Sequence, residues 1–340
     1  ARFAGISGVG VDDRGNLYVG GGFQGSDLRM FTPDGKLGWM LNSLMFCNTY
    51  DVDPASDGTE LYGTYNHLHL DLDQTEPGRE QRYVGYNWDL RRFGEPDRAG
   101  SSQAIVRRLG SEQRLTMFTS GQGTIGDIKI FRYDGELAIP DGGTREHGSV
   151  LWIDGNGDGR QHPEELTKMA SPIGWITGLC VDSQGDLWAA NATTGGCFMR
   201  HFYFQGLTAQ GVPVYHGLKD EGYEDIRFPE EGDKINAWGM ACRMDYDADR
   251  DILVASYPAV PRTGEGDTSP AQYFFGRYDN WSKGQREPRW KQRALEPQLN
   301  PDFFMYEKNL FPYRGYMGLQ IAGDYVFFAA DPKRAGYRLV

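Results

Sequence analysis

The chain has 340 residues, of which 39% are hydrophobic and 13% aromatic, with 46 glycines and a formal net charge of −12. This composition is typical of an ordered globular protein, and the acidic balance without a Lys/Arg run disfavours nucleic acid and anionic lipid as partners. No stretch approaches the roughly 20 apolar residues that cross a bilayer. We therefore expect a secreted or periplasmic monomer that binds neither nucleic acid nor membrane.

One short pattern recurs along the chain: a hydrophobic residue, Asp, a turn with Gly or Asp, then Leu or Ile and an aromatic or aliphatic run. The copies lie at 11–19, 52–62, 181–188 and 244–254, with degenerate copies at 127–139 and 317–328. Each copy predicts two strands joined by a tight turn, because Gly, Asn and Asp suit the turn while β-branched and aromatic residues suit strands. A repeat of short strands without helical periodicity indicates a β-propeller.

The spacing of these hairpins predicts an all-β fold, a single-domain propeller of six, or seven, four-stranded blades. The approximate blades are 1–43, 44–118, 119–168, 169–230, 231–300 and 301–340. The last blade has no visible fourth strand, so either the N-terminal segment closes it or the natural chain continues. We favour continuation, which leaves a seventh blade open.

The hairpin at 176–188 resembles the NHL-repeat propellers and the broader group that includes the gluconolactonase-like enzymes. This resemblance implies the propeller architecture over most of the chain. The lactonases of that group hold a divalent metal on the central axis. The chain lacks their Glu-Gly-Pro and Pro-Asn-Gly motifs, so the resemblance implies the fold without lactonase activity.

The segment 154–165 resembles the twelve-residue calcium loop of EF-hands. Oxygen ligands fall at positions 1, 3, 5, 7 and 12, with Gly159 at the sharp turn of position 6; they are Asp154, Asn156, Asp158, the Arg160 carbonyl and Glu165. Hard oxygen donors at this spacing favour Ca²⁺ over transition metals. The loop follows the predicted strand 149–153, so we expect a structural calcium between the third and fourth strands of a blade.

Polar and aromatic residues gather in the segments that lead into the predicted inner strands. In a propeller these segments meet around the central channel, and aromatic rings beside hydrogen-bonding groups suit a sugar. The candidate substrate-binding residues are Asn48, Trp175, Asn236, Trp238 and Tyr316. The alternative is that the two tryptophans wedge neighbouring blades together.

Three residues are candidates for catalysis. His67 and His69 alternate with Leu68 and Leu70, so both histidines point to one face of a predicted strand. Imidazole is the side chain best suited to transfer protons near neutral pH. In a β-elimination, Tyr50 or His67 would move the proton while Arg314 neutralises a uronate carboxylate. The alternative is that His67 and His69 are structural residues whose hydrogen bonds are all made within the protein.

The sequence thus predicts a calcium-containing propeller enzyme that acts on a carbohydrate or sugar-derived molecule by hydrolysis or β-elimination. The alternative is a non-enzymatic propeller that binds a ligand or a protein, because fold alone does not fix function. The four cysteines have no CxxC spacing, which excludes the usual zinc and thioredoxin motifs; we expect buried small hydrophobes rather than a disulfide framework.

Overall fold

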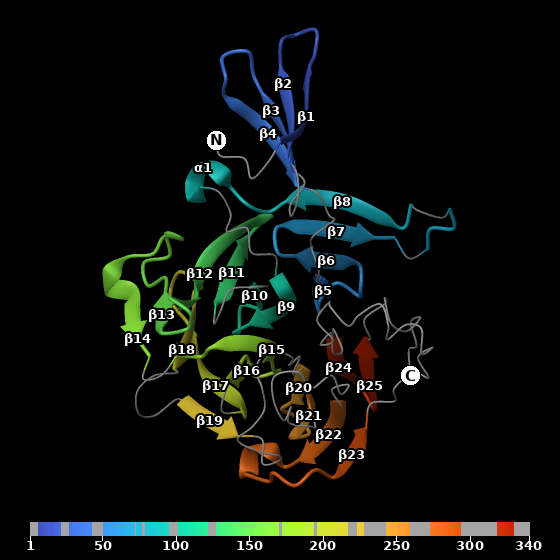
Figure 1. Ribbon diagram of the computed structural model, residues 1–340, viewed down its shortest axis with the longest axis vertical. Helices are drawn as coiled ribbons and strands as arrows, with labels where there is room; N and C mark the ends of the chain where they lie inside the picture. The colour runs from blue at the N-terminus through green and yellow to red at the C-terminus, as the bar shows by residue number, and fades with distance from the viewer. Residues whose placement is uncertain are drawn as a thin grey trace, which may run out of the picture. The chain divides into compact units, whose positions relative to one another are not determined.

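The computed structural model describes residues 6–21, 27–42, 50–71, 73–76, 79–94, 101–121, 127–169, 172–193, 196–216, 223–227, 243–258, 273–293 and 318–329. These residues form an all-β structure of antiparallel sheets, labelled in Figure 1. One short helix, α1 (Leu90–Phe93), follows the second sheet. No helix among these residues has the length and apolarity to cross a membrane.

The chain divides into two compact units. The first comprises Ala1–Arg108, Gln113–Gly123 and Ile130–Pro140, and the second comprises Leu109–Glu112, Thr124–Lys129 and Asp141–Val340.

The first two sheets each contain four strands in chain order. The first sheet consists of β1 (Ile6–Val11), β2 (Leu17–Gly21), β3 (Asp27–Phe31) and β4 (Leu37–Asn42). The second consists of β5 (Tyr50–Val52), β6 (Glu60–Gly63), β7 (Asn66–Leu70) and β8 (Gln81–Tyr86). Consecutive strands pair, as expected for a meander joined by tight turns.

The third sheet has six strands, in the order β14-β13-β12-β11-β10-β9. Its strands are β9 (Ser101–Leu109), β10 (Arg114–Gly121), β11 (Ile128–Asp134), β12 (Leu137–Arg145), β13 (Val150–Ile153) and β14 (Leu166–Lys168). The repeat spacing predicts that 101–118 belong to the preceding blade and that 127–134 form an inner strand, and both predictions are wrong. In the structure β9 and β10 extend this sheet beyond β11.

The remaining sheets follow in the same chain-ordered way. The fourth contains β15 (Trp175–Val181), β16 (Leu187–Thr193), β17 (Gly196–Leu207) and β18 (Pro213–His216), with β19 (Tyr223–Arg227) also pairing with β17. The fifth contains β20 (Arg243–Asp247), β21 (Ile252–Pro258), β22 (Tyr273–Asp279) and β23 (Trp290–Arg293). The sixth contains β24 (Gly318–Ala322) and β25 (Tyr325–Ala329).

The predicted hairpins at 11–19, 52–62, 181–188, 244–254 and 317–328 are therefore present as strand pairs. In the 244–254 copy the marker Asp245 lies inside β20, and the turn carboxylate is Asp247, which accepts the Arg250 N–H at 3.0 Å. Cys180, on β15, is buried, as predicted for a small hydrophobe.

A carboxylate holds the turn of the repeated hairpin in the same way in two sheets. Asp12 Oδ1 accepts the N–H groups of Arg14 and Asn16, and Oδ2 accepts the Tyr18 hydroxyl at 3.0 Å. Each of these donors lies two, four or six residues after the carboxylate.

In the fourth sheet, Asp182 repeats this arrangement at the same spacings. Its Oδ1 accepts the N–H groups of Gln184 and Asp186, and its Oδ2 accepts the Trp188 indole N–H at 3.0 Å. The repeated Asp is thus a turn lock with donors supplied by its own hairpin.

Each unit has a core formed between the faces of consecutive sheets. In the first unit, Tyr62 of the second sheet packs with Val106, Met117 and Phe131 of the third. In the second unit, Trp188 and Met199 of the fourth sheet pack with side chains of the fifth, including Tyr246 and Trp281. Burial of these apolar faces supplies most of the stabilisation of such stacked sheets.

One side-chain bond links the first strands of consecutive sheets and occurs twice. In the first unit, Asp51 Oδ2 on β5 accepts the Val106 N–H of β9 at 2.8 Å. In the second, Asp245 Oδ2 on β20 accepts the Ile321 N–H of β24 at 2.7 Å. The repeat of this bond indicates that β9, like β24, is the first strand of its sheet.

The turn lock predicts a specific stability change. Asp182→Ala removes an acceptor that serves two backbone N–H groups and a buried indole N–H, so we expect a loss of roughly 2–4 kcal/mol in the free energy of unfolding. Urea denaturation monitored by circular dichroism measures it. Gln184→Ala is the control, because only its backbone N–H takes part. Equal stability of the two variants would contradict the lock.

Candidate functional site

The 154–165 loop connects β13 to β14 and wraps around the carboxylate of Asp154. Asp154 has 0% exposure. Its Oδ1 accepts the N–H groups of Gly157 (3.0 Å) and Asp158 (3.2 Å), and its Oδ2 accepts the Gly159 N–H at 2.9 Å. Gly157 and Gly159 have φ values of 76° and 79°, the left-handed conformation that glycine adopts without strain.

The later ligand positions are tied into the same loop. Asn156 Oδ1 accepts the Asp158 N–H at 2.8 Å, and Asp158 Oδ1 accepts the Arg160 N–H at 2.8 Å. A 3₁₀ helix, Pro163–Glu165, then returns the chain, so that Glu165 Oε1 lies 3.3 Å from the Asn156 nitrogen. The loop therefore brings its first, third, fifth and twelfth residues together.

The chemistry of this donor set fits a hard divalent cation. Oxygens would come from three carboxylates, one amide and the Arg160 carbonyl, which are the ligand types and positions of a calcium loop. Across the described residues, no group of three or more His, Cys, Asp or Glu side chains is arranged to hold a metal by itself. A cation in this loop would therefore also draw on the Asn156 amide and the Arg160 carbonyl.

Two polar side chains of the loop are engaged with each other. His162 Nε2 lies 2.9 Å from Asp158 Oδ2. This hydrogen bond lowers the pKa of the Asp158 carboxyl and raises the pKa of the His162 imidazole.

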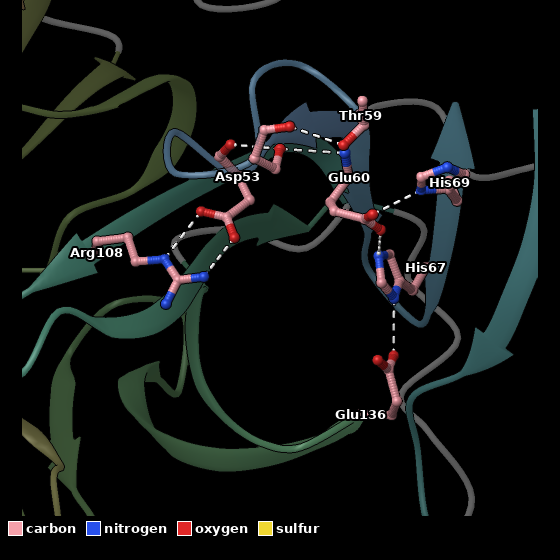
Figure 2. Close-up of polar contacts among 8 residues, drawn as sticks. Asp53, Thr59, Glu60, His67, His69, Arg108 and Glu136 are labelled. Carbon is pink, nitrogen blue, oxygen red and sulfur yellow. Dashed lines mark hydrogen bonds and ion pairs between the residues drawn. The ribbon is translucent and has the colours of Figure 1, made fainter. Parts of the chain in front are cut away.

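A second polar cluster lies on the second sheet and is drawn in Figure 2. His67 Nε2 lies 2.5 Å from Glu60 Oε2, and His67 Nδ1 lies 2.8 Å from Glu136 Oε2. His69 Nδ1 lies 2.6 Å from the other Glu60 oxygen. His67 and His69 therefore share one face of β7, as predicted, and Glu60, His67, His69 and Glu136 form what we call the histidine–carboxylate cluster.

The cluster runs from a buried centre to an exposed end. The His67 side chain is 6% exposed and its ring stacks on Tyr62, whereas the Glu136 side chain is 58% exposed. Although burial favours the neutral acid, hydrogen bonds from His69 and His67 lower the pKa of Glu60. Burial and the nearby carboxylates raise the pKa of Tyr62 to about 12. Glu136 is thus the most exposed carboxylate that contacts the buried imidazole.

Part of this cluster is a repeated structural unit. On β16 and β17, His201 Nε2 lies 2.7 Å from Asp186 Oδ2, and its ring stacks on Trp188 with 3.5 Å between ring centroids. Trp188 faces His201 across the strands as Tyr62 faces His67. Glu60, Tyr62 and His67 thus match Asp186, Trp188 and His201, and we call each set an acid–aromatic–histidine unit. Around His67 this unit is extended by His69, from the same strand, and by Glu136, from the turn between β11 and β12.

Tyr50 and His67 lie on opposite faces of the second sheet. The register pairs Asp51 with Tyr62 and Tyr62 with His67, while Tyr50 pairs with Gly63 in the adjacent row. Because successive residues of a strand alternate faces, Tyr50 points away from the histidine–carboxylate cluster. Tyr50 and His67, the two residues predicted to move a proton, therefore cannot both contact the same substrate atom.

The other predicted substrate and catalytic residues are not placed in either cluster. Asn48, Asn236, Trp238, Arg314 and Tyr316 lie outside the described residues. Trp175 begins β15, and only its backbone is described. Their roles stay predictions.

Sequence reasoning did not identify Glu60 and Glu136 as partners of His67. Glu60 had a detectable signal, because it precedes Leu61 and Tyr62 as Asp186 precedes Leu187 and Trp188. No sequence pattern connects Glu136 with His67, because Glu136 lies in a turn 69 residues farther along the chain.

An ion pair with a buried carboxylate, Asp53–Arg108, lies to one side of the histidine–carboxylate cluster in Figure 2. Asp53 Oδ1 accepts from Arg108 Nε at 2.9 Å, and Oδ2 accepts from Nη2 at 2.5 Å. The Asp53 side chain is 5% exposed. Burial acts to raise its pKa, but the hydrogen bonds from Arg108 and the Ala55 N–H and the charge of Arg108 outweigh burial and lower it.

No protein-family model matches the chain, and no curated protein matches its sequence. Among solved structures, it is similar to the virginiamycin B lyase of Staphylococcus aureus (11% identity, TM-score 0.33, covering 96% of this chain and 92% of that one). It is also similar to the calcium structure of a Trichoderma reesei carbohydrate-active enzyme of family AA12 (10% identity, TM-score 0.38, covering 98% of this chain and 91% of that one). A third similar structure is the PQQ domain of pyranose dehydrogenase from Coprinopsis cinerea (11% identity, TM-score 0.32, covering 80% of this chain and 93% of that one). Likenesses with TM-scores this low do not establish a shared fold or activity.

The Asp53–Arg108 pair predicts an acid-sensitive contribution to stability. Because the folded pKa of Asp53 lies below its ordinary value of 3.8, the contribution is complete above that pH and is lost as the pH falls below it. Arg108→Ala should lower the free energy of unfolding by about 3 kcal/mol near pH 7, and this deficit should shrink toward pH 3. Denaturant titrations across this range measure it, with the exposed Arg82→Ala as control. A deficit independent of pH would contradict the assignment.

Proposed function

We propose that this chain is a calcium-binding protein of the β-propeller type, in which the 154–165 loop holds a structural Ca²⁺. The observation that carries the proposal is the fully buried Asp154 carboxylate, which accepts N–H groups from three successive residues of the loop. This carboxylate stands at position 1, the first ligand position of a twelve-residue calcium loop, and Gly159 stands at position 6, where such a loop turns sharply. Three carboxylates within twelve residues also repel one another, and a divalent cation would neutralise that repulsion.

The propeller architecture, with six or seven blades, is part of this proposal. Six antiparallel sheets follow one another along the described chain, and three of them contain four strands. The bond from Asp51 to Val106 and the bond from Asp245 to Ile321 each join first strands of consecutive sheets. Both features are what a ring of blades around inner strands would produce.

The calcium proposal predicts that the ion stabilises the chelator-treated full chain. Ca²⁺ at about 100 times its Kd should add roughly 2.7 kcal/mol to the free energy of unfolding. Glu165→Gln should abolish this gain, whereas Glu164→Gln at the adjacent exposed position should keep it. Thermal unfolding with and without Ca²⁺ and isothermal calorimetry make the measurement. A wild-type chain that neither binds nor is stabilised by Ca²⁺ would rule the site out.

A second candidate function is an enzyme that acts on a carbohydrate or sugar-derived molecule, by hydrolysis or β-elimination. The observation that favours it is the addition of Glu136 and His69 to an acid–aromatic–histidine unit that elsewhere has one carboxylate. An exposed carboxylate backed by a buried imidazole can pass a proton between a ligand and the protein interior. In an elimination, the proton beside a uronate carboxylate is removed and the glycosidic oxygen leaves, which creates a carbon–carbon double bond.

The enzymatic candidate predicts turnover of acidic oligosaccharides by the purified chain. β-Elimination gives a product that absorbs ultraviolet light, whereas hydrolysis gives reducing ends without that absorbance. His67→Ala should lower turnover by roughly 100-fold or more. His201→Ala, in the matching unit of the fourth sheet, should leave it unchanged. Equal effects of the two substitutions would assign both histidines to structure, and assays with chelator test dependence on the metal.

A further inference from the structure

The carboxylate of Glu165 is anchored by a residue outside the 154–165 loop. Trp152, on β13, donates its indole N–H to Glu165 Oε2 at 3.0 Å. The same oxygen accepts the His162 backbone N–H at 3.1 Å, and Oε1 faces the Asn156 N–H at 3.3 Å. Three donors therefore fix the orientation of this carboxylate, and Trp152 is the one supplied by the sheet.

The sheet holds Trp152 in place from several sides. Its side chain is 3% exposed, and its backbone pairs with Gly143 on β12 and Leu166 on β14. The guanidinium of Arg145 lies over the indole ring, 4.8 Å from its centroid. Arg145 in turn donates to the carbonyl of Thr144 at 2.9 Å. The sheet thus fixes the position of the indole N–H that donates to Glu165.

We propose that Trp152 is a positioning residue for calcium binding: it presets Glu165 for the ion and couples the loop to the sheet. This inference rests on the proposed calcium site. Hydrogen bonds to metal-ligating carboxylates orient the ligand before the metal arrives, which reduces the ordering that binding requires. Calcium entry changes the charge beside Oε2, so the indole N–H also reports occupancy of the loop.

The fourth sheet supplies a matched control. Trp188 is equally buried at 3% exposure and donates its indole N–H to a carboxylate, Asp182 Oδ2, at 3.0 Å. That carboxylate locks a hairpin turn and belongs to no calcium loop. Substitution of either tryptophan by phenylalanine removes the same kind of bond, and only Trp152→Phe removes it from a ligand of the ion.

The experiment titrates the chelator-treated full chain with Ca²⁺ by calorimetry. We expect Trp152→Phe to weaken calcium binding by roughly 10- to 100-fold, in the range found for such outer partners of metal ligands. Trp188→Phe should lower thermal stability and leave the calcium affinity unchanged. If Trp152→Phe binds Ca²⁺ as tightly as the wild type, Trp152 has no positioning role. If the wild type binds no Ca²⁺, the proposed function fails instead, and the two failures are therefore distinct.

A second readout applies if Trp152→Phe does not fold. In ¹⁵N-labelled wild-type protein, the Trp152 indole N–H resonance is identified as the one that Glu165→Gln shifts in chelator and Glu164→Gln does not. We expect Ca²⁺ to shift this resonance in proportion to the bound ion. A resonance that stays unchanged while calorimetry shows saturation would overturn the proposal.

Discussion

Carboxylates that accept backbone N–H groups from the next few residues are the interaction on which this structure depends. Asp12 and Asp182 each close a hairpin by accepting the N–H groups two and four residues later. An ionised carboxylate makes stronger hydrogen bonds than a neutral acceptor, so each turn is fixed with little help from distant residues. Some of the acidic residues of the chain therefore stabilise its turns.

The 154–165 loop extends the same interaction to a larger turn. Asp154 accepts three backbone N–H groups where Asp182 accepts two, and Asp154 is fully buried. In the hairpins an aromatic side chain also donates a hydrogen bond to the carboxylate, as Trp188 does to Asp182. In the loop the aromatic donor Trp152 instead serves the last ligand, Glu165. Local turn geometry and a candidate cation site are thus built from one kind of contact.

Repetition also separates structural from functional histidines. His67 and His201 both stack on an aromatic residue and bond an acid of the neighbouring strand. A histidine in such a unit has a structural role whatever else it does. Around His67, the β11–β12 turn adds the exposed Glu136 and β7 adds the second imidazole of His69, and a proton-transfer role would depend on these additions.

Features whose partners lie close in sequence were the ones that could be predicted. Asp12, Asp182 and Asp154 each accept hydrogen bonds from donors within the next six residues, so the spacing of the sequence alone identifies these turns. The strands β9 and β10 were assigned to the wrong sheet because their turn lacks the Asp signature and instead uses Gly110 and Gln113 with positive φ.

Contacts between distant segments left no local pattern. Arg108 reaches Asp53 across 55 residues, and Glu136 reaches His67 across 69. Tyr50 and His67 both looked suited to proton transfer, but only the strand register shows that they face opposite sides of the sheet.

The most direct test of the account is a crystal structure of the full chain grown with Ca²⁺. The account predicts a single ion in the 154–165 loop, with oxygens of Asp154, Asn156, Asp158, the Arg160 carbonyl and Glu165 at about 2.3–2.6 Å from it. An ordered loop without an ion at saturating Ca²⁺ would contradict the central claim.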